Sequence, residues 1–114
     1  MALHHVQSGE VADLAPLGEK LGDTKTSALA KSDSFEAIRL VVPAGKQVPA
    51  HEVAGEITLH CLEGRALLQL DHESIELSAG QWIYLEGGKR HAVKGIDDCS
   101  LLLTILFVHR EARP

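Results

Sequence analysis

The side chains best suited to chemistry in this 114-residue sequence are two histidines that stand at fixed distances from glycines. His51 follows Gly45 after five residues, and His91 follows Gly88 after two. An imidazole titrates near neutral pH, so it can donate or accept hydrogen bonds and serve as a general base. His51 and His91 are therefore our best candidates for catalytic residues. The competing interpretation is that both rings only satisfy backbone groups or a trapped water.

The segment after Gly55 alternates between apolar and polar side chains, which is the period of a half-buried strand. The apolar set is Ile57, Leu59 and Cys61, and the polar set is Glu56, Thr58 and His60. Burying a large apolar side chain contributes roughly 1.5–3 kcal/mol, so we expect the apolar set to face the core. A one-residue bulge at Gly55 is the alternative, and it would turn the polar set inward instead.

The rest of the chain reads as short strands separated by glycine turns, without a long amphipathic helix. The expected strands are Phe35–Val42, Ile57–Cys61, Ala66–Leu70, Ile75–Leu77, Trp82–Leu85, Arg90–Val93 and Ser100–His109. Val11–Leu14 and Ser27–Leu29 are expected as short edge strands, with turns or a helical turn between them. This spacing predicts an all-β antiparallel sandwich or barrel.

Composition excludes several classes of partner. The net charge is −5, and no clustered basic face offers itself to a phosphate backbone, so nucleic acid is not expected. The longest apolar run, Leu101–Val108, is about half the length that spans a bilayer. No signal peptide is recognisable, and the two cysteines, Cys61 and Cys99, fit reduced thiols. We therefore expect a cytoplasmic protein that contacts neither membrane nor nucleic acid.

Two glycine–histidine patterns together resemble the motifs of the cupins, a family of jelly-roll barrels. The first family motif places a glycine, a histidine and a closing glycine where this chain has Gly45, His51 and Gly64. The second matches at Gly80, Gly88 and His91. The resemblance implies a double-stranded β-helix, or jelly-roll barrel, at residues 35–109. Residues 1–34 would then pack on the barrel as edge strands and turns, and residues 110–114 would form a loose tail.

The chain departs from the family pattern at the positions that matter for a metal. Val53 stands at the second histidine position and Ile57 at the glutamate position, while Glu86 and Gly95 replace the motif's proline and asparagine. Two of the family's four ligands are therefore missing, and two histidines alone hold a metal poorly. We expect no bound metal. The alternative is Fe, Mn, Zn or Ni at low occupancy, held by His51 and His91 with Glu56 or His60.

The resemblance implies a pocket inside the barrel around the two histidines. The residues expected to line it are His51, His91, Val53, Ile57, Leu59, Cys61, Trp82 and Tyr84. Its ligand would be a small metabolite, which is anionic if Lys89 and Arg90 attract it, and the chain would bind it or turn it over. Two alternatives remain open: a metal-dependent dioxygenase or isomerase with a rearranged ligand set, and a non-catalytic sensor or assembly module. Resemblance to small cupins and the apolar final strand favour a homodimer.

Overall fold

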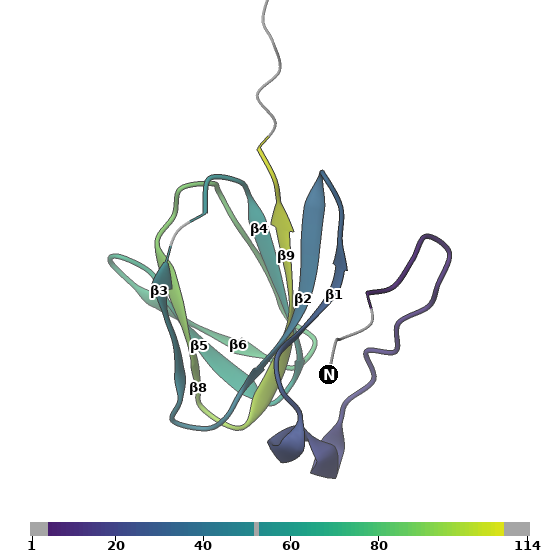
Figure 1. Ribbon diagram of the computed structural model, residues 1–114. Helices are drawn as coiled ribbons and strands as arrows, with labels where there is room; N and C mark the ends of the chain where they lie inside the picture. The colour runs from purple at the N-terminus through teal and green to yellow at the C-terminus, as the bar shows by residue number, and fades with distance from the viewer. Residues whose placement is uncertain (1–4, 52, 109–114) are drawn as a thin grey trace, which may run out of the picture.

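The computed structural model describes residues 5–51 and 53–108, which form nine β-strands and one 3-10 helix (Figure 1). The helix is η1 (Gly18–Asp23). The strands are β1 (Ser27–Lys31), β2 (Phe35–Val42), β3 (Gln47–His51), β4 (Ile57–Glu63), β5 (Arg65–Gln69), β6 (Ser74–Ser78), β7 (Trp82–Leu85), β8 (His91–Gly95) and β9 (Cys99–Leu106). The strands pair antiparallel throughout this part of the chain.

The strands form two sheets that face each other. One sheet has the order β1-β2-β9-β4-β7, and the other has the order β3-β8-β5-β6. Figure 1 shows them as the opposite walls of a barrel. Because the chain passes back and forth between the sheets, strands that are distant in sequence become neighbours, as β2 and β9 do. This is the jelly-roll topology, and it confirms the expected all-β double-stranded β-helix.

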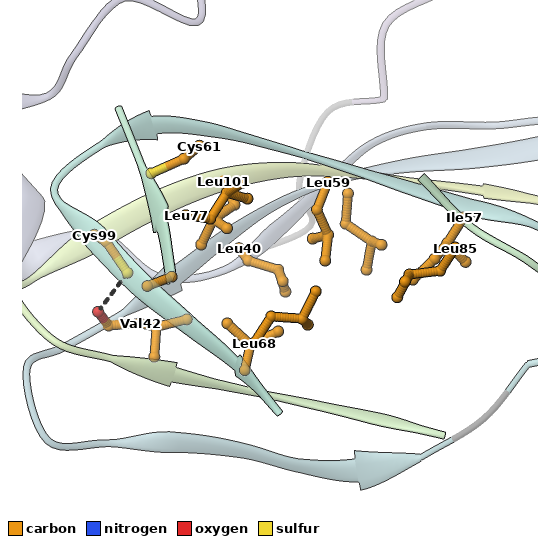
Figure 2. Close-up of a cluster of buried hydrophobic side chains, with 13 residues drawn as sticks. Leu40, Val42, Ile57, Leu59, Cys61, Leu68, Leu77, Leu85, Cys99 and Leu101 are labelled. Atoms are coloured by element: carbon orange, nitrogen blue, oxygen red, sulfur yellow. Dashed lines mark hydrogen bonds between the residues drawn. The ribbon is translucent and has the colours of Figure 1, made fainter. Parts of the chain in front are cut away.

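The barrel is filled by apolar side chains from both sheets. Ile57, Leu59 and Cys61 on β4 are at most 2% exposed and belong to this core, which Leu68 and Leu101 join from β5 and β9 (Figure 2). Thr58 and His60, between them, are only half-buried on the outward face of the strand. The apolar register expected for this strand is therefore correct.

Gly55 is required for close packing and not for a bulge. A Cβ added there would lie 1.7 Å from the carbonyl oxygen of Leu106. The backbone N–H of Leu106 donates to the carbonyl of Glu56 at 2.9 Å, so β9 runs directly against this glycine. The alternative register, which needed a bulge at Gly55, is wrong.

The N-terminal segment lies against the outward face of the five-stranded sheet and is held by side chains. Arg39 on β2 is only 7% exposed and donates to the carbonyl oxygens of Asp13 and Ala15. The expected edge strand at Ser27–Leu29 is present within β1. The one at Val11–Leu14 is wrong, because its backbone joins no ladder and Val11 is 92% exposed.

The described residues begin at His5 and end at Val108, so the predicted tail at 110–114 and His109 lie outside them. The final strand, expected to reach His109, ends at Leu106. Within the described ranges, no helix is both long and apolar enough to cross a membrane.

Candidate functional site

His91 opens β8 and faces the barrel interior. It is 3% exposed, and it shares its side of the strand with Val93, which packs in the core. Its Nδ1 lies 3.1 Å from the carbonyl oxygen of Lys89. A carbonyl can only accept, so in the neutral ring Nδ1 carries the proton and Nε2 is the acceptor nitrogen. The Lys89 carbonyl therefore fixes both the tautomer and the orientation of the ring.

The backbone of His51 is the register partner of His91. Val48 on β3 pairs with Val93, and the next pair is His51 with His91. Between these two pairs the chain advances three residues along β3 but only two along β8. The register of the pair therefore shifts by one residue, and the shift falls at Pro49-Ala50. Sequence reasoning missed it, although a proline inside a strand indicates an edge strand or a bulge. The structure thus brings the backbones of the two candidate histidines together.

Two glycines fasten the loop that carries His91. The backbone N–H of Gly88 donates to the carbonyl of Val53 at 2.8 Å. A Cβ at Gly87 would lie 2.2 Å from the carbonyl oxygen of Ala54, so only glycine fits there. The β7–β8 loop therefore sits directly on the β3–β4 connection, which holds His91 beside the end of β3.

The other residues expected in the pocket fall into two groups. Ile57, Leu59 and Cys61 face inward and are packed in the core, with Val53 half-buried against it. Trp82 and Tyr84, at 60% and 46% exposed, point outward, so their placement inside the barrel is wrong. The reason is the register of β7, in which Ile83 and Leu85 pair with Leu59 and Ile57 and take the inward positions.

The rearranged metal-ligand set is not assembled. Glu56 is exposed and accepts a hydrogen bond from the hydroxyl of Tyr84, and His60 pairs with Trp82 on the outward face. Ile57, at the family's glutamate position, is buried and has no donor atom. Among the residues that the structure describes, no three histidine, cysteine, aspartate or glutamate side chains form a group able to hold a metal. These residues do not fit a complete cupin metal centre.

A surface hollow of about 380 Å³ opens beside the ends of β5 and β7. It is lined by Leu70, Asp71, His72, Glu73, Tyr84, Leu85, Glu86, Lys89 and Arg90. Lys89 and Arg90 immediately precede His91, which connects this hollow to the loop that orients the buried ring. Three carboxylates share the hollow with the two cations, so it offers charges of both signs.

The sequence and the structure were compared with those of known proteins. The family model described as "Cupin domain" matches residues 38–107, while no curated protein matches the sequence. A cupin superfamily protein from Desulfitobacterium hafniense is 25% identical, with a TM-score of 0.70 over 73% of this chain and 76% of that one. A conserved protein of unknown function from Streptococcus pyogenes is 18% identical, with a TM-score of 0.75 over 96% and 97%. The DMSP lyase DddQ from Ruegeria pomeroyi is 24% identical, with a TM-score of 0.65 over 87% and 54%. The family match spans the barrel strands from within β2 to the end of β9, and the chain accordingly belongs to the cupin family.

Proposed function

We propose that this cupin binds a small polar metabolite at the end of the barrel where His91 and His51 meet, without a resident metal. The observation that carries the proposal is His91 itself: a buried imidazole on the interior side of β8, whose Nδ1 lies 3.1 Å from the carbonyl oxygen of Lys89. A histidine held in this way can exchange hydrogen bonds with a hydroxyl, amide or acid group of a ligand.

The pairing of the two histidine backbones supports a shared site. The backbone of His51 is the register partner of His91, so a ligand at His91 would lie beside the end of β3. Our proposal includes the His51 imidazole as a second group that binds the ligand, or that moves a proton if the ligand is turned over.

The surroundings favour recognition by hydrogen bonds over coordination by a metal. Ile57 fills a ligand position of the family with a buried aliphatic side chain, and Val53 fills another. A metal with only two imidazoles would lack the further ligands that fix its geometry. The barrel fold hosts many unrelated functions, so it does not choose between binding and turnover.

The charges near His91 support a polar ligand more than a strongly anionic one. Lys89 and Arg90 line the adjoining hollow, but Asp71, Glu73 and Glu86 line it too. The field of the two cations is thus opposed by nearby carboxylates. A ligand with both an acidic and a hydroxyl or amino group suits this arrangement best.

The test is a thermal-shift screen of small hydroxy, amino and carboxylic acids on protein purified without a metal column. We expect at least one stabilising compound whose effect is lost in His91→Ala and retained in His60→Ala. His60 is the matched control, because it is a histidine on the outward face of the neighbouring sheet. Elemental analysis of the same preparation should find well under one metal ion per chain.

Three results would contradict the proposal. Stoichiometric iron or manganese that disappears in His91→Ala would indicate a metal centre. A stabilising compound that acts equally on wild type and His91→Ala would place its site elsewhere. A screen without any stabilising compound would favour the sensor or assembly module. A cytoplasmic location, expected from the thiols Cys61 and Cys99, remains part of the proposal.

A further inference from the structure

Residues 11–25, which lead into β1, form a strap that lies outside the barrel wall (Figure 1). Within the described ranges 5–51 and 53–108, no backbone–backbone hydrogen bond joins the strap to a strand. Leu21 is its one buried side chain, at 7% exposed, whereas Val11 is 92% exposed. The strap therefore has neither a ladder nor a large apolar contact to hold it on the barrel.

The carboxylate of Glu63, at the end of β4, holds the middle of the strap. It accepts hydrogen bonds from the backbone N–H of Leu17 at 2.8 Å and of Gly18 at 3.2 Å. The hydroxyl of Ser100 on β9 donates to the same carboxylate at 3.0 Å. An ionised carboxylate accepts all three bonds, whereas a protonated carboxyl loses its charge and turns one oxygen into a donor. Protonation of Glu63 therefore weakens the attachment of the strap.

The guanidinium of Arg39 on β2 holds the part of the strap that precedes Leu17. It donates to the carbonyl of Ala15 at 2.8 Å and to that of Asp13 at 3.4 Å, and the residue is only 7% exposed. Its Nε has no hydrogen-bond partner among the described residues. A buried cation is stable only where charge and hydrogen bonds offset its lost hydration. The strap carbonyls and the nearby charge of Glu63 provide that offset, so the two attachments depend on each other.

The core of the barrel does not depend on the strap. The buried apolar cluster is built from β2 and from β4 to β9, and none of its described members lies in residues 11–25. If the strap opens, Arg39 and the outward side of β2 meet solvent, while the two sheets and the core between them keep their contacts. Segments with few buried apolar contacts open at a lower free energy than the whole domain does.

We propose that the strap is a pH-sensitive latch, which opens as a unit when Glu63 is protonated while the barrel stays folded. The groups near Glu63 are Arg39 from β2, Ser100 from β9, the thiol of Cys61 from β4 itself and the N–H groups of the strap. Burial raises the pKa of Glu63, but the hydrogen bonds and Arg39 outweigh it, so the pKa lies below its usual value. The latch is therefore closed at neutral pH and opens as pH falls through that lowered pKa.

The test is hydrogen–deuterium exchange of the full chain from pH 7 to pH 3, with protection corrected for the pH dependence of chemical exchange. We expect the strap to lose protection by roughly tenfold or more at acid pH, while peptides of β4 and β9 remain protected. Glu63→Gln should show the same loss in the strap already at pH 7. Glu73→Gln, at an exposed carboxylate of the β5–β6 turn, is the matched control and should exchange like wild type.

The other attachment has its own variant. Arg39→Met removes both donors to the strap and also the charge that lowers the pKa of Glu63. The pH at which the strap opens should therefore rise in this variant. Arg65→Met is the control, because it removes an arginine from an exposed ion pair with Asp97 and should leave that pH unchanged.

The wild-type pH series needs no variant, so the inference stays testable even if Glu63→Gln fails to fold. A strap that keeps its protection at pH 3 would overturn it. Equal losses of protection in the strap and in β9 would also overturn it, because the strap would then open only together with the barrel. None of these readouts depends on a ligand at His91, so failure here and failure of the proposed binding site are distinguishable.

Discussion

Glu63, at the end of β4, accepts a 2.8 Å hydrogen bond from the backbone N–H of Leu17, 46 residues earlier in the chain. The same carboxylate accepts from the N–H of Gly18 and from the hydroxyl of Ser100, with Arg39 nearby. Burial raises the pKa of Glu63, but these hydrogen bonds and the guanidinium outweigh it, so the pKa lies below its usual value. The ionised carboxylate therefore joins the N-terminal segment to the barrel together with Arg39, which bonds the carbonyls of Asp13 and Ala15.

The lowered pKa of Glu63 predicts the direction of a pH effect. A carboxyl whose folded pKa lies below its unfolded value of about 4.3 stabilises the fold above that pH. The contribution is lost as pH falls through the lower, folded pKa. We expect urea titrations from pH 7 to pH 3 to show a smaller loss of unfolding free energy for Glu63→Gln than for wild type. Glu73→Gln, at an exposed carboxylate, is the control and should follow wild type. Parallel curves for all three proteins would contradict the prediction.

The register of β4 predicts opposite outcomes for two adjacent substitutions. Leu59 is 1% exposed in the centre of the core, so Leu59→Ala should lower the free energy of unfolding by about 2–5 kcal/mol. Thr58 is half-buried on the outward face, and Thr58→Ala should cost under about 1 kcal/mol. Chemical denaturation of both variants measures the difference. Equal losses at the two positions would mean that the alternation does not separate inside from outside.

The fold could be predicted because its signals are local. Alternation at Ile57, Leu59 and Cys61 defines a face within one strand, and spaced glycines mark the turns. The placement of Trp82 and Tyr84 could not be predicted in the same way. All four residues of β7 are apolar, so the period does not show which pair faces inward. Only pairing with β4 decides it, and that pairing joins segments about 25 residues apart.

The candidate site was predictable in its residues and not in its geometry. His51 and His91 stand out by their spacing from glycines. Their pairing depends on the extra residue in β3, and the tautomer of His91 depends on the Lys89 carbonyl. The contact of Glu63 with Leu17 is likewise invisible in the sequence, because it joins a strand end to a segment without regular structure. Such contacts follow from the tertiary fold and leave no local pattern.

Two glycines with similar backbone conformations predict different tolerance to alanine. Gly64 has a φ of +75°, and a Cβ there would lie 2.2 Å from the carbonyl oxygen of Asp98. Gly80 has a φ of +89°, with nothing within 4 Å of the added Cβ. Gly80→Ala should therefore cost only the conformational penalty of about 1–2 kcal/mol. Gly64→Ala adds an overpacking cost of about 1–3 kcal/mol. The melting temperatures of the two variants compare these costs. Equal melting temperatures would show that the backbone at Asp98 can move away from the added Cβ without lowering stability.

Both cysteines should be unreactive in the folded protein. Cys61 and Cys99 are fully buried free thiols, and the Sγ of Cys99 lies 3.5 Å from the carbonyl of Val42 (Figure 2). Burial raises the pKa of both, and that of Cys99 reaches about 12. At pH 8 only about one Cys99 in ten thousand would then be a thiolate, which is the nucleophilic form. We expect a chromogenic disulfide reagent to label no thiol in the native protein at pH 8, and two per chain in guanidinium. Rapid labelling of either thiol in the native state would mean that the part of the core around Cys61 and Cys99 opens to solvent.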